Sequence, residues 1–184
     1  MTAIPASVHH HRIELRLRDL AQLFNSLDPT PFHHKDLDPD AEKFIESWAL
    51  EFPPDSRFHI SVHLENQPPG GDPSDLVTEA IHNYFNYEAE LVRRDLKRMW
   101  RHGRISLVIG LSFLAACLLI ADTLSHVASA GTFLTIVRES LTIGGWVALW
   151  RPLEIFLYDW WPLVRRRRIY LNLARAQIRV TTGA

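Results

Sequence analysis

Hydrophobic residues alternate with polar ones in two short segments near the start of the chain. In residues 13–17, Ile13, Leu15 and Leu17 alternate with charged side chains. Residues 58–64 repeat this pattern, with histidine and serine at the polar positions. A two-residue period predicts a half-buried strand in each segment.

Between these strands the spacing of hydrophobic residues changes to that of a helix. Asp38 and Pro39 are typical of a helix start, and Pro53–Pro54 marks the end. A second helix begins near Asp72–Pro73, and it can run unbroken into the apolar segment that follows. Two strands joined by a helix are expected to be parallel. Since two strands make too small a sheet, further strands from another subunit, or covering helices, are expected. The hydrophobic stripe of the first helix holds Ala41, Phe44, Ile45, Trp48, Ala49 and Phe52.

The longest uncharged segment is Ile105–Ala121. A helix of this length, with a few flanking residues, can cross a hydrocarbon core of about 30 Å. Basic residues from Arg93 to Arg104 precede it, and Asp122 follows, which is the positive-inside pattern of a helix that enters from the cytoplasm. The segment therefore predicts a first transmembrane helix.

A second span is expected between Phe133 and Val164, although this stretch contains several charges. Trp160 and Trp161, followed by four arginines, are typical of a cytoplasmic membrane interface. One long tilted helix, bent near Pro152 or at a glycine pair, is favoured. The alternative is a span at Phe133–Trp150 followed by an interfacial segment.

Together these patterns predict an α+β membrane protein. A small β-α-β-α cytoplasmic domain would precede a two-helix transmembrane hairpin and a short C-terminal amphipathic helix. Both ends of the chain would lie in the cytoplasm, which makes it a multi-pass protein of the inner (plasma) membrane. The expected segments are a soluble domain (1–92), a basic juxtamembrane helix (93–104), a first span (105–124), an outer loop (125–132), a second span (133–164) and a basic tail (165–184).

Charge is divided unequally along the 184 residues. Residues 1–92 contain 6 Lys and Arg against 16 Asp and Glu, whereas residues 93–184 contain 14 against 5. Because the basic half also holds the apolar segments, anionic lipid headgroups rather than nucleic acid are the expected partner. The single cysteine, Cys117, excludes a disulfide within the chain. The candidates for headgroup contact are Arg98, Arg101, Arg104, Arg165, Arg166, Arg167, Arg168, Trp160 and Trp161.

Charged residues inside the second span are the candidates for an intramembrane role. Arg151 and Glu154 are three residues apart and therefore neighbours on a helix. They could neutralise each other or pair between subunits, line an ion or proton path, or extend to the interface. The first two readings imply a homo-oligomer or a larger membrane complex. The full set is Arg151, Glu154, Asp159, Arg138 and Glu139.

Ten histidines raise the question of a metal site. His59 and His63 share a strand face, but at about 3.3 Å per residue they lie roughly 13 Å apart, too far to share one ion. Asp36, Asp38 and Asp40 lack the glycine and terminal glutamate of a calcium loop. The sequence contains no nucleophile elbow, no phosphate-binding glycine loop and no HExxH motif. No metal, cofactor or enzymatic activity is therefore expected.

Two segments, SLDPTPFHHKDLDPDAEKFI (26–45) and GGWVALWRPLEIFLYDWWP (144–162), resemble a group of uncharacterised bacterial inner-membrane proteins. This resemblance implies an inner-membrane location and a two-pass topology, and it implies no activity. The function expected from the sequence is a membrane-anchored scaffold or accessory subunit that binds its partner through the acidic domain. The alternatives are a channel or transporter subunit, with Arg151, Glu154 and Asp159 in a polar path, and a histidine-based metal or pH sensor.

Overall fold

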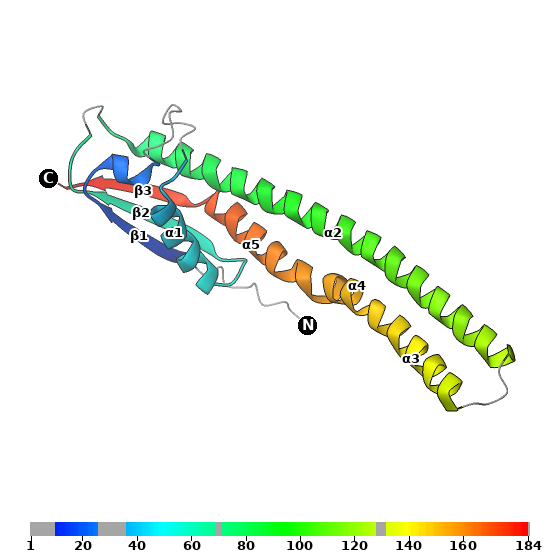
Figure 1. Ribbon diagram of the computed structural model, residues 1–184. Coiled ribbons are helices and arrows are strands. Elements are labelled where there is room, and N and C mark those ends of the chain that lie inside the picture. Colours follow the sequence, from blue (N-terminus) through cyan, green and yellow to red (C-terminus); the bar gives the residue numbers. More distant parts are fainter. Residues whose placement is uncertain (1–9, 26–35, 69–70, 128–131, 184) are drawn as a thin grey trace, which may run out of the picture. The chain divides into compact units, whose positions relative to one another are not determined.

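The computed structural model describes residues 10–25, 36–68, 71–127 and 132–183. The chain divides into two compact units (Figure 1). Unit 1 combines Met1–Arg93 with Val164–Ala184, and unit 2 is Arg94–Leu163. Residues 165–184, expected as a basic cytoplasmic tail, thus belong to the same unit as the N-terminal half of the chain.

Unit 1 is built on a parallel sheet of three strands in the order β1-β2-β3. The strands are β1 (His10–Leu17), β2 (Arg57–Leu64) and β3 (Gln177–Thr182). Ile13 pairs with Ile60, which in turn pairs with Ile178, so that hydrophobic residues share one face across all three strands. The strands expected at 13–17 and 58–64 are present and parallel.

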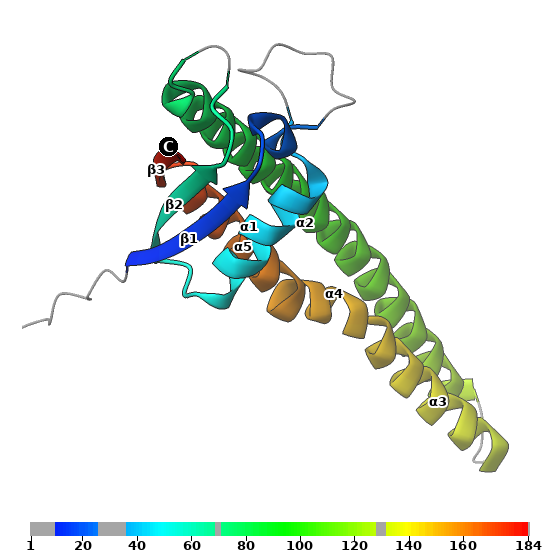
Figure 2. The ribbon, with the colours of Figure 1, turned by 90° about the vertical axis from the view of Figure 1, so that its left-hand side faces the viewer.

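Helices cover the hydrophobic face of the sheet (Figure 2). They are α1 (Pro39–Glu51), the first part of α2 (Ser74–Val127) and the last part of α5 (Trp160–Leu173), and a short 3-10 turn, η1 (Leu20–Leu23), adds Leu23 to the core. Asp38 caps α1 by accepting a hydrogen bond from the amide of Asp40 at 3.0 Å. The core includes Ile45, Ile60, Val62, Ile81, Phe85, Ile169, Tyr170 and Leu173.

The stripe predicted for α1 is only partly buried. Ile45 and Ala49 are fully buried, whereas Phe44 and Trp48 are 41% and 43% exposed. Only one side of α1 contacts the rest of unit 1, so a stripe as wide as the predicted one leaves its outer members in solvent.

Unit 2 contains the second half of α2 and the chain that returns from it. The returning chain forms α3 (Thr132–Ala148), α4 (Trp150–Glu154), a π-helical turn η3 (Ile155–Asp159) and the start of α5. In the chain, unit 2 is preceded by β2 and the first part of α2, and it is followed by the rest of α5 and β3. Strands β2 and β3 are neighbours in the sheet. Unit 2 is therefore inserted into the crossover connection between two adjacent parallel strands.

The predicted two-helix transmembrane hairpin is wrong. Within the described residues, one helix is long and apolar enough to cross a membrane, and it is the continuous helix Ser74–Leu124. The expected second span, 133–164, is not one helix: α3 has 17 residues, and the chain then passes through α4 and a π-helical turn. Charged residues and Pro152 interrupt this stretch, whereas 105–121 contains neither. The multi-pass topology deduced from that hairpin is wrong for the same reason.

The prediction of a short C-terminal amphipathic helix is also wrong. Helix α5 ends at Leu173, and Gln177–Thr182 forms β3. Ile178 and Val180 alternate with polar residues, which is a strand pattern, and they pair with Ile60 and Val62. The third strand thus comes from the same chain, and no second subunit is needed to complete the sheet. Within the predicted outer loop 125–132, residues 125–127 still belong to α2 and Thr132 begins α3, while 128–131 lie outside the described residues.

Candidate functional site

The apolar half of α2 exposes its hydrophobic side chains. Its most apolar window of 18 residues has a mean hydropathy of 2.3, and only 17% of that window is buried. Val108 and Leu119, for example, are 65% and 68% exposed. A core helix of a soluble protein would bury such residues. The surface of this helix therefore matches lipid better than water.

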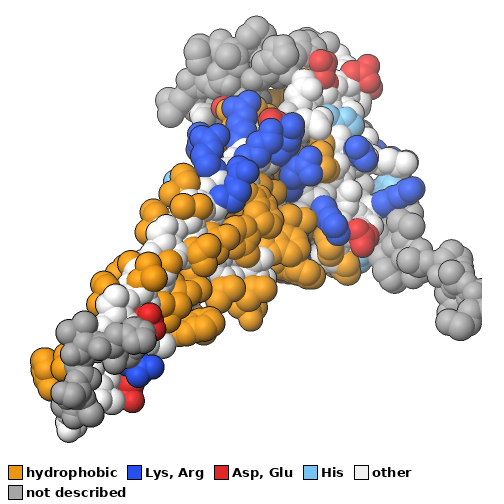
Figure 3. All heavy atoms as spheres, turned by 90° about the vertical axis from the view of Figure 1, so that its right-hand side faces the viewer, with side chains coloured by type: hydrophobic (Ala, Val, Ile, Leu, Met, Phe, Trp, Pro, Cys, Tyr) orange, Lys and Arg blue, Asp and Glu red, His pale blue; other side chains and the backbone are white. Residues whose placement is uncertain are grey.

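Helix α3 adds to the same hydrophobic surface. Phe133, Ile143, Trp146 and Val147 are all largely exposed, as is Trp150 at the start of α4. Figure 3 shows a broad area of hydrophobic side chains over these helices, with Lys and Arg side chains gathered at one end. So large an exposed apolar surface marks a site of contact with a membrane or a partner.

Small residues hold α3 against α2. A Cβ atom on Gly110 would lie 2.9 Å from the carbonyl oxygen of Ala148. A Cβ atom on Gly145 would lie 2.7 Å from Cδ1 of Leu114, and the same helix side continues to the buried Cys117. Small residues permit this close approach of two helix backbones, as they do between helices in membranes.

The glycine contacts show which charges lie at the same level in unit 2. A Cβ atom on Gly103 would lie 2.9 Å from Cγ2 of Ile155. The basic segment of α2, residues 93–104, therefore faces the chain just after Arg151. No charged residue lies between Arg104 and Asp122 on α2, and none lies between Glu139 and Arg151 on the returning chain. At 1.5 Å per residue, the uncharged stretch is about 25 Å long on α2 and about 16 Å long on the returning chain, and together these stretches form a hydrophobic band flanked by charges.

Arg151 is the centre of an ion cluster in this flanking region. Its Nη1 atom lies 2.9 Å from Glu154 and 3.6 Å from Asp159. The π-helical turn Ile155–Asp159 follows Glu154 and ends with Asp159, and such turns occur frequently at functional sites. Arg151 thus offsets part of the charge of the two carboxylates, and the three side chains together carry a net charge of −1. The cluster lies at the end of the hydrophobic band rather than at its middle, which agrees with an interfacial position.

Arg138 and Glu139 occupy the opposite end of the band. Both are exposed, and neither forms an ion pair with another described residue. The structure does not bring them together with Arg151. Their intramembrane role stays a prediction.

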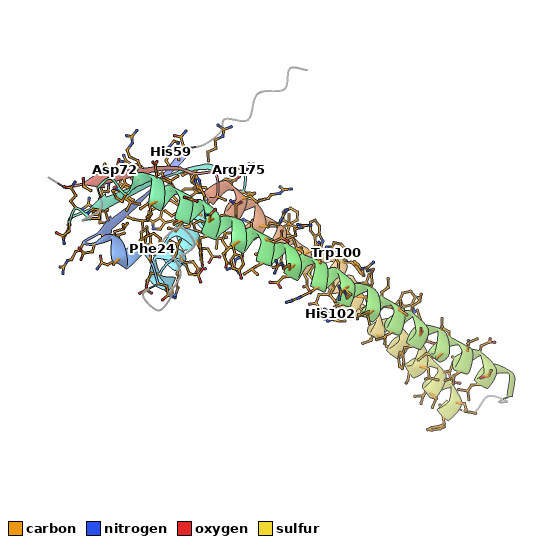
Figure 4. The ribbon with its side chains drawn as sticks, turned by 90° about the horizontal axis from the view of Figure 1, so that it is seen from above. Phe24, His59, Asp72, Trp100, His102 and Arg175 are labelled. Atoms are coloured by element: carbon orange, nitrogen blue, oxygen red, sulfur yellow. The ribbon has the colours of Figure 1, made fainter. Side chains whose placement is uncertain are left out.

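The basic segment of α2 precedes the hydrophobic band directly. Arg93 pairs with Glu90 at 2.9 Å and Arg98 with Asp95 at 3.6 Å, while Arg101 and Arg104 are exposed. Trp100 (Figure 4) packs on Phe156, with ring centroids 5.4 Å apart. Trp160 donates a hydrogen bond from Nε1 to the carbonyl of Phe156 at 3.0 Å. These tryptophans lie at the level where interfacial aromatics are expected.

Two members of the arginine run hold α1 in place. Arg165 donates hydrogen bonds to the carbonyls of Leu50 at 2.6 Å and Phe52 at 3.4 Å. These bonds supply partners to carbonyl groups at the end of α1 that have none within the helix. Arg166 pairs with Glu46 at 2.8 Å. Contact of these arginines with headgroups stays a prediction, because the structure shows them engaged within unit 1.

An acidic cluster surrounds Arg166, and sequence reasoning missed it. Burial, followed by repulsion from Glu42, raises the pKa of Glu88 above its ordinary value. Burial and a hydrogen bond with Glu42 raise the pKa of Tyr84. These residues come from α1, α2 and α5, far apart in the sequence. Only the packing of the three helices brings them together.

The histidines that the structure describes do not gather around a common point. Nδ1 of His63 is 2.7 Å from the hydroxyl of Thr181, and Nε2 of His82 is 2.9 Å from the carbonyl of Ala176. In the described part of the chain, no three His, Cys, Asp or Glu side chains are placed to hold a metal ion. His9, His33 and His34 lie outside the described residues.

In comparisons with known proteins, no family model, no curated protein and no solved structure matches this chain.

Proposed function

We propose that the chain is a non-enzymatic, membrane-anchored scaffold or accessory subunit. The observation that carries this proposal is the exposed, uncharged surface of α2 between Arg104 and Asp122. Its length of about 25 Å approaches the thickness of a hydrocarbon core, roughly 30 Å. The basic residues before it are suited to bind anionic headgroups.

Unit 1 would be the part that binds the partner. Its helix α1 presents Phe44 and Trp48 side by side, with ring centroids 6.2 Å apart, and both rings are exposed. Asp40 and Glu51 lie on the same exposed side of the helix. Exposed aromatic residues with a charged surround are typical of protein interfaces.

Membrane anchoring is tested by alkaline extraction of membranes from cells that express the chain. We expect the native chain to stay in the membrane pellet. Arg costs about 2.5–3.5 kcal/mol at the centre of a span, so Leu111→Arg combined with Ala115→Arg should release the chain. Tyr87→Arg, an exposed position in unit 1, is the matched control. Release of the native chain itself would refute the anchor.

The partner-binding role is tested by mild detergent extraction and identification of co-purifying proteins. A protein that co-purifies with the native chain should be lost with Phe44→Ala combined with Trp48→Ala. It should be retained by a control variant, Ser47→Ala, on the same helix. A partner that binds the double variant equally well would exclude this surface.

A further inference from the structure

A second feature, independent of the hydrophobic band, lies in unit 1 at the start of β2 and β3. A pocket of about 500 Å³ opens there between the loop before β2 and the end of α5. Its wall carries Arg57, Arg168 and Arg175 together with His59, and Asp55 is the one acidic residue. His59 and Arg175 are labelled in Figure 4. Three arginines from three segments thus converge on one cavity.

These arginines have no acidic partner among the described residues. By contrast, Arg165 donates hydrogen bonds to the last carbonyls of α1, and Arg166 is paired with the carboxylate of Glu46. Arg57, Arg168 and Arg175 are exposed at the pocket and form no ion pair with a described residue. Residues 164–184 contain six arginines and no acidic residue, so the region lacks the counter-charge that the acidic N-terminal half supplies elsewhere.

The wall of the pocket is braced by Asn172. Its side-chain amide donates to the carbonyls of Pro54 at 2.7 Å and Ser56 at 3.1 Å, which fixes the loop against α5. Ser56 is 3% exposed, and its hydroxyl has no hydrogen-bond partner among the described residues. The cavity is therefore preformed, and an unsatisfied polar group lies in its wall.

We propose that this pocket binds a phosphate-bearing anion. Arginine side chains offer forked donors that match the oxygens of phosphate or carboxylate. A phosphate monoester presents three oxygens and nearly two negative charges, so it can bond to more of the three guanidinium groups than a carboxylate, which presents two oxygens and one charge. A volume of about 500 Å³ leaves room for more than a single phosphate group.

The end of α5 does not oppose this assignment. A helix C-terminus carries partial negative charge, which disfavours an anion. Here, however, the amides of Ala174, Arg175 and Ala176 bond to carbonyls of the last turn at 2.8, 3.2 and 3.0 Å. Arg175 itself follows the helix directly and adds a full positive charge at that end.

Calorimetric titration of the full chain in neutral detergent micelles with inorganic pyrophosphate tests the proposal. We expect saturable binding at low salt. Because a hydrogen bond to a charged group contributes about 1.5–3 kcal/mol, Arg57→Ala, Arg168→Ala and Arg175→Ala should each raise the Kd about tenfold or more. Arg18→Ala, an exposed arginine of unit 1 outside the pocket, is the control and should leave the Kd unchanged. Circular dichroism checks that each variant is folded.

The source of the phosphate is separated by competition. Micelles that contain phosphatidic acid should weaken pyrophosphate binding if a lipid headgroup is the natural ligand, and leave it unchanged if the ligand is soluble. Either result supports a phosphate site. Equal binding by Arg18→Ala and the pocket variants, absence of saturable binding, or equally tight binding of succinate would overturn it.

Discussion

At the residue scale, neighbouring arginines of one run have different tasks. Arg165 satisfies the last carbonyls of α1, Arg166 neutralises Glu46, and Arg168 faces the pocket. The sequence places all of them together and predicts one common role in headgroup binding. Helical geometry instead points successive side chains in different directions, so each meets a different partner.

The carboxyl group of Glu88 should make stability depend on pH. Its pKa is raised in the folded protein because it is partly buried and faces Glu42, Glu46 and Asp36, an effect that Arg166 partly offsets. The folded state thus holds this proton more tightly than the unfolded state. The stabilisation is complete below about pH 4.5, the ordinary value, and is lost as pH rises through the raised pKa.

Glu88→Gln should therefore raise the melting temperature at pH 8, while the difference from the native chain should vanish near pH 4. Thermal unfolding followed by circular dichroism across this range measures both. Glu79→Gln, on the same helix, serves as control. A Glu88→Gln variant with the same pH profile as the native chain would contradict the assignment.

The pair Arg151–Glu154 should couple weakly. Both side chains are about half exposed, at the end of the hydrophobic band. We expect a coupling energy of about 0.3–1 kcal/mol, as for other accessible pairs in one helix. The measurement is a double-mutant cycle of Arg151→Gln and Glu154→Gln, with unfolding in detergent micelles. A coupling above about 2 kcal/mol would instead place the pair in a dry, low-dielectric interior.

At the element scale, the helix contact in unit 2 depends on missing side chains. Gly110 faces the backbone oxygen of Ala148, and a backbone atom cannot turn aside as a flexible side chain can. Gly144 is adjacent to Gly145, the other glycine at this helix contact. A Cβ atom added to Gly144 would nevertheless have no neighbour within 4 Å. The two positions make a matched pair for one experiment.

Gly110→Leu should destabilise unit 2 by about 1–3 kcal/mol through overpacking, whereas Gly144→Leu should have little effect on this contact. Proximity of the two helices can be followed by crosslinking between Cys117 and a cysteine introduced at Gly145, whose Cβ atom would lie 3.4 Å from Cβ of Cys117. Unchanged crosslinking in Gly110→Leu would show that the close approach is not required.

Elements with a strong local pattern were predictable, and elements that depend on distant partners were not. The strands at β1 and β2, the cap of α1 and the apolar half of α2 follow from spacing alone. The segment β3 is only six residues long and follows a helix, so its alternation acquires meaning only beside β2. The same applies to the pocket around Arg57 and to the acidic cluster, whose members are distant in sequence.

At the scale of the whole molecule, β3 completes the sheet after unit 2 has been traversed. Replacing Ile178 and Val180 with aspartate would put charges on the hydrophobic face of the sheet. We expect a loss of about 2–4 kcal/mol and faster proteolysis of unit 1. Arg179→Ser, on the other face of the same strand, is the control. If both variants resist proteolysis equally, β3 is dispensable for the sheet.

The insertion of unit 2 between two adjacent strands fixes the order of events during synthesis. β1, α1 and β2 emerge from the ribosome first, but β2 gains its second neighbour only when Gln177–Thr182 has been made. The hydrophobic band of α2 emerges in between, while the sheet still has an open edge. Such long-range pairing slows folding and exposes that edge to aggregation. Early delivery of α2 to a lipid surface would shield the apolar band during this interval, so expression without membranes should favour aggregates over soluble protein.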